Sequence, residues 1–205
     1  MQLTDKVLDR LNKQLKIFSS KDTRPVLKSM HYTKSGDVEF TNSHVAVRLK
    51  KCHYCEEKTV PETDTFYPSL SRIFDGLNQG SSIKLNTKDM TNILSPFSKE
   101  KQPVIIVNFT KQGILFKSQE PEEFVVVSAK LDVELDMDEP FYVAANPKYL
   151  YDCFNFFRLL KIDTVQMTYS SAVKPMLFTF ENLEYLVTPV RAGNDLKIKS
   201  KELKE

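Results

Sequence analysis

The sequence predicts an α+β fold in which amphipathic helices pack on antiparallel sheets. The first observation is a repeat: an amphipathic helix followed by three short strand-like runs occurs three times along the 205 residues. The second is composition, because 14 Phe and 8 Tyr without any Trp favour a β-rich core. The third is balance, since 41% hydrophobic and 27% charged residues are typical of a globular protein. No apolar run reaches the roughly 18 residues that a membrane helix needs.

The first unit begins with a helix that Thr4 caps and that extends to about Phe18. Apolar residues gather on one side of it at helical spacing: Val7, Leu8, Leu11, Leu15 and Phe18. The opposite side carries a basic stripe of Lys6, Arg10 and Lys13. Strands are expected at residues 26–32, 38–41 and 45–49, with turns at 35–37 and 42–43.

The second unit opens near Asn86 with a helix whose apolar residues also recur at helical spacing: Met90, Ile93, Leu94 and Phe97. Pro96 lies inside this stretch and predicts a shortened or kinked helix, because proline removes a backbone N–H. Strands are expected at residues 104–109, 114–117 and 124–129.

The third unit has the clearest helix start, with Asn146 as the N-cap and Pro147 at the first helical position. Its buried side is formed by Leu150, Cys153, Phe154, Phe157 and Leu160. Strands are expected at residues 165–169, 176–180 and 185–188, and the charged tail at 197–205 is expected to fray. The longer connection between the first two units, about residues 52–82, leads from acidic residues into an aromatic-proline run, and we place the domain boundary there.

The net charge and the cysteines limit which ligands the protein is expected to bind. The net charge is only +2, so any contact with DNA requires that basic residues be segregated on one surface. Cys52 and Cys55 have C-x-x-C spacing, but a structural zinc site needs four ligands and there is no second such motif. With Cys153 the count is odd, so we expect reduced thiols, no metal and no cofactor. The start of the chain differs from a signal or transit peptide, which makes the cytoplasm the expected compartment.

An enzyme is not expected. The sequence has no P-loop, no G-x-S-x-G and no H-E-x-x-H motif. One acidic run precedes an expected strand and has no His companion, so it is interpreted as a solvated strand edge or loop; it contains Asp132, Glu134, Asp136, Asp138 and Glu139. Cys153 lies on the apolar side of its helix, which disfavours a role as a nucleophile.

Four stretches of the chain form a recognisable series: R-P-V-L-K-S-M-H-Y at 24–32 with E-F-T-N-S-H-V-A-V at 39–47, F-Y-P-S-L-S-R-I at 66–73, N-P-K-Y-L-Y-D at 146–152 and L-V-T-P-V-R at 186–191. Taken in this order, they resemble the bacterial sliding clamp, the β subunit of DNA polymerase III. The resemblance covers about residues 4–191 and implies the sliding-clamp (DNA clamp) fold of repeated helix-plus-antiparallel-strand units.

The resemblance also implies a shortened chain, because we count three units where a bacterial clamp subunit has six. Residues 1–60 resemble the first half of the clamp's middle domain, residues 61–82 its linker, and residues 83–205 its C-terminal domain with a charged tail. The small size makes a phage-encoded relative the expected source. An unpaired half-domain would leave a sheet edge and an apolar helix face exposed, so self-association into a homo-oligomer is expected.

In clamps, partner proteins insert a short hydrophobic motif into a cleft between the last two domains. The matching positions here are Leu27, Thr41, His44, Pro68, Arg72, Ile73, Leu186, Thr188, Pro189, Val190 and Arg191. Leu27, Ile73, Leu186 and Val190 would form apolar walls suited to a peptide groove. Val45 replaces the usual Arg after the His, and Thr188 replaces a Met, which makes the expected pocket smaller and more polar. By composition alone His44 would be structural, and Arg72 and Arg191 would be solvated surface.

The resemblance implies two classes of partner and leaves two functions open. Lys6, Arg10, Lys13 and Lys148 would meet the phosphate backbone of double-stranded DNA without reading sequence, although a solvated helix face explains them equally well. The first function is a processivity factor that tethers a polymerase or another replication protein to DNA. The alternative is an adaptor or decoy that binds clamp-partner motifs without encircling DNA. Neither involves a membrane.

Overall fold

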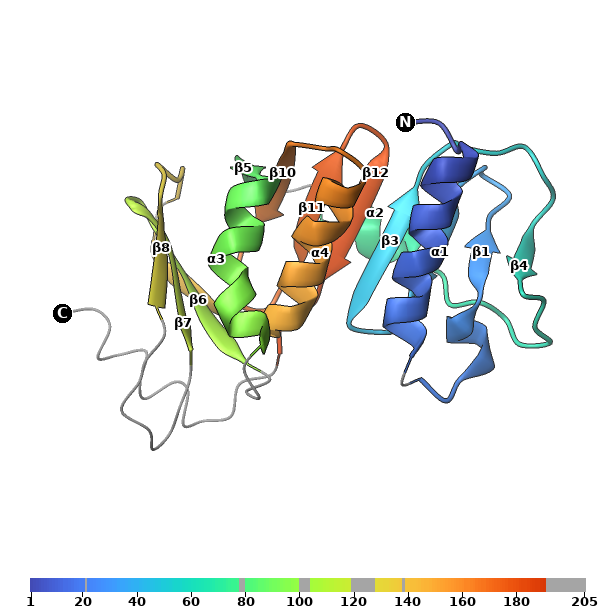
Figure 1. Ribbon diagram of the computed structural model, residues 1–205, viewed down its shortest axis with the longest axis horizontal. Helices are drawn as coiled ribbons and strands as arrows, with labels where there is room; N and C mark the ends of the chain where they lie inside the picture. The colour runs from blue at the N-terminus through green and yellow to red at the C-terminus, as the bar shows by residue number, and fades with distance from the viewer. Residues whose placement is uncertain (21, 78–79, 100–103, 119–127, 138, 191–205) are drawn as a thin grey trace.

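The computed structural model describes residues 1–20, 22–77, 80–99, 104–118, 128–137 and 139–190 (Figure 1). Three long helices lie on one face of the molecule: α1 (Asp5–Ser19), α3 (Thr87–Lys99) and α4 (Pro147–Leu159). A short helix α2 (Ser71–Asp75) lies behind the sheet, and a 3-10 turn η1 (Pro25–Lys28) follows α1. No helix within the described ranges combines the length and the hydropathy needed to cross a membrane.

Two antiparallel sheets support these helices. The larger has the order β4-β1-β2-β3-β12-β11-β10-β5, and the smaller has the order β8-β7-β6-β9. The strands of the larger sheet are β1 (Met30–Tyr32), β2 (Val38–Thr41), β3 (Val45–Leu49), β4 (Lys58–Val60), β5 (Ser81–Asn86), β10 (Thr164–Tyr169), β11 (Met176–Phe180) and β12 (Leu183–Val187). Those of the smaller sheet are β6 (Ile105–Thr110), β7 (Gly113–Ser118), β8 (Ser128–Asp132) and β9 (Phe141–Ala145).

The larger sheet is symmetric about the pairing of β3 with β12. Val45 lies opposite Val187 there, and Leu49 lies opposite Leu183. On each side a three-stranded meander follows, and an outer strand closes it: β4 pairs with β1 as β5 pairs with β10. The N-terminal half-domain, α1 with β1–β4, is therefore joined to the C-terminal domain by a continuous sheet.

Amphipathic helices cover this sheet as their spacing predicts. Leu11, Leu15 and Phe18 of α1 are buried in the main core, and the phenol of Tyr185 on β12 accepts a hydrogen bond from buried Gln14 at 3.1 Å. Thr4 caps α1, and the Asn146 side chain caps α4 by accepting from two backbone N–H groups. The expected helices are confirmed, including their caps.

Several expectations about local structure are wrong. Residues 25–28 form the 3-10 turn η1, not the start of a strand, because Pro25 supplies no N–H to a ladder and fixes a helical φ. Helix α3 is not ended by Pro96 and continues to Lys99, whereas the alternative of a kink stays a prediction. Elements β4 and α2 lie in the connection for which no element was expected, and the unexpected strand β5 begins at the end of that connection and continues to the start of α3. The strand expected at 124–129 is found at Ser128–Asp132, and residues 124–127 are outside the described ranges.

The expectation that the half-domain is unpaired, from which self-association was inferred, is also wrong. The half-domain is not left unpaired, because β3 adds to β12 of the same chain and β4 covers β1. In addition, the C-terminal units each start with a strand before the helix, since β5 leads into α3 and β9 precedes α4.

Candidate peptide cleft and nucleic-acid interface

A row of four titratable side chains crosses the larger sheet on the face away from the long helices. Going from β1 to β12, each residue lies opposite the next, in the order His31, Glu39, Arg48 and Glu184. All four are buried. Two ion pairs hold the ends, because His31 Nδ1 lies 3.0 Å from Glu39 Oε1 and Arg48 Nε lies 2.7 Å from Glu184 Oε2. We call these four residues the polar row.

The segment after β4 is fixed on the polar row. Tyr67 stacks on His31 with 4.7 Å between ring centroids, and its phenol oxygen accepts from the Thr41 backbone N–H at 3.0 Å. At α2, the Phe74 ring lies 4.5 Å from the Arg48 guanidinium, and Asp75 pairs with Arg48 at 2.9 Å. These contacts hold residues 67–75 against the half-domain, beside the β3–β12 junction.

His44 and Thr188 meet at the junction although they are far apart in sequence. The backbone N–H and the hydroxyl of Thr188 both donate to the His44 carbonyl, each at 2.9 Å. The exposed His44 ring stacks on Tyr149 of α4, with 6.0 Å between centroids. Tyr149 is missing from the expected cleft residues, although it lies in the 146–152 stretch that carries the resemblance.

The four expected wall residues differ in exposure. Leu27 and Leu186 are each 3% exposed, whereas Ile73 is 48% exposed and Val190 is half-buried. Leu186 belongs to a small apolar cluster with Leu70 and Phe74 from the linker. An incoming side chain at this surface would meet Ile73 directly and Leu186 only after displacing the linker.

Val190 packs elsewhere, on the smaller sheet. It contacts Ile106 and Ala144, and its backbone N–H donates to the Ala144 carbonyl at 2.8 Å. The structure therefore separates two of the expected walls, Leu186 and Val190, into different apolar clusters. His44 and Thr188 join the half-domain to the C-terminal segment.

The polar members of the expected cleft also differ. The hydroxyl of buried Thr41 donates to the Val45 carbonyl at 2.7 Å, which closes the β2–β3 turn. Pro68 and Arg72 are exposed, and Pro189 is half-buried. Arg191 lies outside the described residues.

The three long helices have a more basic charge balance than the whole chain. Helices α1, α3 and α4 carry eight basic and four acidic side chains, whereas the whole chain has 29 and 27. Lys6, Lys13 and Lys148 are exposed and Arg10 is half-buried. Lys13 pairs with Asp9 and Lys148 with Asp152, each at 2.8 Å, so part of this charge is compensated locally. The three helices therefore carry twice as many basic as acidic side chains, and a DNA contact at this face stays a prediction.

The cysteines lie apart from both surfaces. Burial raises the pKa of Cys52 to about 11, and burial also raises the pKa of Cys153, so both stay protonated thiols near neutral pH. Cys55 Sγ lies 3.0 Å from His53 Nδ1. Within the described ranges, no three His, Cys, Asp or Glu residues are grouped as a metal ion would need.

The arrangement of helices and sheets is that of a DNA sliding clamp. Three solved clamps illustrate the likeness, each covered over 94% of this chain. They are the Helicobacter pylori β clamp bound to a DNA ligase peptide (13% identity, TM-score 0.70, 65% of that chain covered), a putative DNA polymerase III β subunit from Eubacterium rectale (13%, 0.73, 65%) and the DNA polymerase III β chain of Streptococcus pneumoniae (17%, 0.71, 64%).

These neighbours are bacterial DNA polymerase III β subunits, and this chain has their fold in a shortened form. It spans slightly less than two thirds of the length of the clamps it matches. No family model and no curated protein matches the sequence. The expected fold class and the resemblance to clamps are confirmed at the level of the fold.

Proposed function

We propose that this chain is a clamp-like, non-enzymatic protein that binds a short hydrophobic segment of a replication partner at the β3–β12 junction and contacts duplex DNA through its helical face. The observation that carries the proposal is the meeting of three distant segments at one junction of a clamp fold. Thr188 bonds to His44, Tyr67 bonds to Thr41, and Phe74 covers Leu186. One solved neighbour, the Helicobacter pylori clamp, is bound to a DNA ligase peptide.

The junction suits a peptide for physical reasons. Ile73 is a large apolar side chain left 48% exposed, next to the Leu70–Phe74 cluster. Exposed His44 at the junction and exposed Arg72 on α2 can supply hydrogen-bond donors. A peptide with Gln followed by Leu and Phe would bury two apolar side chains, each worth roughly 1.5–3 kcal/mol before ordering costs. The expected affinity is micromolar, or about −8 kcal/mol.

Titration with such a peptide tests the cleft. Ile73→Asp should weaken binding at least tenfold, because a carboxylate would be desolvated without a partner. Ile73 is exposed, so this variant should fold, whereas Leu186→Asp would disrupt a buried cluster. Val173→Asp is the matched control, since Val173 is 83% exposed in the β10–β11 turn. Equal binding by the wild type and by Ile73→Asp would remove the cleft from the proposal.

The DNA face is tested separately. A Lys6→Glu and Lys13→Glu double variant should weaken association with duplex DNA and lower its salt dependence, and should leave peptide binding intact. Lys174→Glu, in the same turn as Val173, changes charge away from the helices and should have little effect. Unchanged DNA association in the double variant would exclude α1 as the contact surface.

The two candidate functions differ in whether the protein encircles DNA. A ring needs further copies, and the outer edge of β8 offers a position for one. β3 and β12 are each the last strand of a three-stranded meander, and they pair with each other. β8 is the last strand of the third meander, so it has the equivalent position. Retention on circular but not on linear DNA, by a self-associated protein, would support the processivity factor.

The adaptor or decoy is favoured by a different observation. The half-domain closes its own edge with β4 and has one long helix where the C-terminal domain has two. A monomeric mass at micromolar concentration, together with peptide binding, would select this function. Both measurements use the full chain.

A further inference from the structure

The loop between β3 and β4 brings a thiol and an imidazole together, and the functions proposed above do not use it. The Sγ atom of Cys55 lies 3.0 Å from Nδ1 of half-buried His53, and the Cys55 backbone N–H donates to the same nitrogen at 3.2 Å. Of the three cysteines, which all lie in the described ranges, Cys55 alone is exposed. A reagent arriving from solvent would therefore meet this thiol first, with the imidazole beside it.

Hydrogen bonds fix the tautomer of His53. Its Nε2 lies 2.9 Å from the backbone carbonyl oxygen of Asp37, and because a carbonyl oxygen only accepts, Nε2 carries the hydrogen and donates. Nδ1 receives the backbone N–H of Cys55, so Nδ1 is the unprotonated nitrogen. The Nδ1 lone pair therefore faces the Cys55 thiol. A nucleophile beside a base that a third group orients is the arrangement in which side chains are activated for attack.

The turn between β1 and β2 holds His53 in place. The backbone N–H groups of Cys52 and His53 both donate to the Gly36 carbonyl, at 2.7 and 3.2 Å. Gly36 has a φ of 86°, and a Cβ atom there would lie 2.7 Å from the His53 carbonyl oxygen, so this close approach requires glycine. The His53 ring also meets the Tyr32 ring edge-on, with 5.1 Å between centroids. These contacts keep Nδ1 directed at Cys55.

Cys52, the other cysteine of the C-x-x-C motif, is in a different state. Its S–H donates to the Leu49 carbonyl at 3.3 Å, and burial raises its pKa to about 11. Cys52 therefore stays protonated near neutral pH, and a protonated thiol attacks neither a disulfide from solvent nor one formed on Cys55. The motif combines one exposed thiol beside a base with one unreactive thiol.

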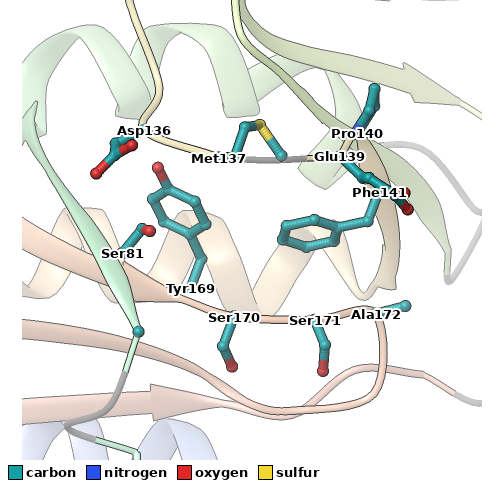
Figure 2. Close-up of a pocket in the computed structure, with 11 residues that line it drawn as sticks. Ser81, Asp136, Met137, Glu139, Pro140, Phe141, Tyr169, Ser170, Ser171 and Ala172 are labelled. Carbon is teal, nitrogen blue, oxygen red and sulfur yellow. The ribbon is translucent and has the colours of Figure 1, made fainter.

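The hollow of the C-terminal domain has a different chemistry (Figure 2). The exposed carboxylates of Asp136 and Glu139 lie at its opposite ends, beyond the rings of Tyr169 and Phe141. Its described lining includes serine hydroxyls but neither a thiol nor an imidazole. The pairing of a thiol with a base is therefore a feature of the β3–β4 loop and not of this hollow.

We propose that Cys55 is a site of covalent modification by small organic disulfides, and that His53 is the base that activates its thiol. The Cys55 S–H proton moves to His53 Nδ1, and the thiolate attacks one sulfur of the disulfide. A bond forms between Cys55 Sγ and that sulfur while the S–S bond of the disulfide breaks. The departing thiolate takes the proton from His53. The products are a mixed disulfide on Cys55 and one small thiol, and the reaction ends there because Cys52 does not displace the new bond.

Exchange with oxidised glutathione tests the site. The reduced full chain is incubated with it at pH 7 and followed by intact mass and peptide mapping, and we expect one glutathionyl group per chain, on Cys55. The control is Val173→Cys in a Cys55→Ser chain, because Val173 is 83% exposed in the β10–β11 turn. Cys55 should react about tenfold faster or more, since an ordinary exposed thiol is only a few per cent thiolate at this pH. Equal rates would overturn the proposal, and so would an internal disulfide between Cys52 and Cys55 as the product.

Two His53 variants separate activation of the thiol from support of the loop. His53→Asn places an amide oxygen near the position of Nδ1, so it keeps an acceptor for Cys55 but removes the base. His53→Gln can still donate to the Asp37 carbonyl and so keeps the contact that holds the ring. Both should lower the exchange rate about tenfold, to that of the control cysteine. Circular dichroism checks that each variant is folded, and one folded variant is sufficient. A wild-type rate in a folded variant would exclude His53 as the base.

Discussion

The two halves of the larger sheet close their outer edges by different physical means. In the C-terminal domain, the six-residue strand β5 buries Ile83 and Leu85 and leads directly into α3, which packs on α4. In the half-domain, the three-residue strand β4 is mostly exposed and leads into a loop. Near β4, Glu57 lies 3.2 Å from His31, which in turn contacts Glu39. One edge is held by apolar burial and the other by charge.

The difference lies in what supports each half of the sheet. β4 has in the half-domain the position that β5 has in the C-terminal domain, and the polar row with its covering linker packs on the face away from the long helices. The half-domain then depends on its junction with β12, where Arg48 meets Glu184, Asp75 and Phe74. Removing one partner of a buried ion pair is strongly destabilising, because it leaves the other charge buried and unpaired.

Arg48→Met should give the largest loss of stability, about 3–5 kcal/mol, because it leaves Glu184 buried with Lys50 as its only remaining ion-pair partner among the described residues. Urea unfolding at neutral pH measures this. Arg48→Met with Glu184→Leu should recover most of the loss, since an apolar pair of similar volume is often as stable as a buried ion pair. A double variant as unstable as the single one would contradict the electrostatic explanation of the junction.

Leu85→Ala should destabilise the opposite edge by about 2–5 kcal/mol, because Leu85 is 2% exposed and its removal leaves a cavity. This loss should be the same at pH 6 and pH 8, since apolar packing carries no proton. A loss that changes with pH would break the contrast between the two edges. Lys84→Ala is the control, as Lys84 is exposed on the same strand.

His31 makes the half-domain sensitive to pH. Burial opposes its charge, but hydrogen bonds and attraction from Glu39 and Glu57 outweigh burial and raise the pKa of His31 above its ordinary value of 6.5. Its contribution to stability should therefore be complete below pH 6.5 and be lost as the pH rises through the raised pKa. Unfolding free energies of the wild type and His31→Gln should converge between pH 6 and pH 9. A gap that widens over this range would show that the neutral ring is the stabilising form.

The helix caps should show the smallest effects, and they compare α1 of the half-domain with α4 of the C-terminal domain. Asn146 accepts from the N–H groups of Lys148 and Tyr149, whereas Thr4 accepts from one N–H among the described residues, that of Val7, at 3.4 Å. Asn146→Ala should cost about 1 kcal/mol, and Thr4→Ala nearer the lower limit of about 0.5 kcal/mol. Thermal unfolding of both variants tests the order. A larger loss for Thr4→Ala would mean that α1 stabilises the chain more than its contacts indicate.

Periodicity predicted the parts of the fold that bury a continuous face. The helices and most meander strands were found in this way, because their apolar residues recur at 3.6 or 2 residues. Strand β4 has three residues and no buried side, so only its pairing with β1 defines it. Strand β5 does alternate, at Ile83 and Leu85, but its signal merges with the start of α3. Elements defined by a distant partner are those that the sequence pattern missed.

The candidate cleft shows the same division. The resemblance predicted which segments gather at the junction, and His44 with Thr188 shows that they do. It could not predict which side chains the linker covers, so Leu27 and Leu186 were expected as open walls and are buried. The sequence pattern also did not predict the polar row, because its alignment depends on how the strands pair. Its four residues lie on four strands, and only the register places them in line.

The pairing of β3 with β12 has a consequence for how the chain is made. Arg48 and Glu184 are 136 residues apart in the sequence, so β3 is synthesised long before β12, the strand with which it pairs. At roughly 5–20 residues per second, synthesis separates the two strands by on the order of ten seconds. During that interval the nascent half-domain presents a bare strand to the cell, and forming so distant a contact is slow. Chaperone demand should therefore arise at the first sixty residues, before the C-terminal domain has been translated.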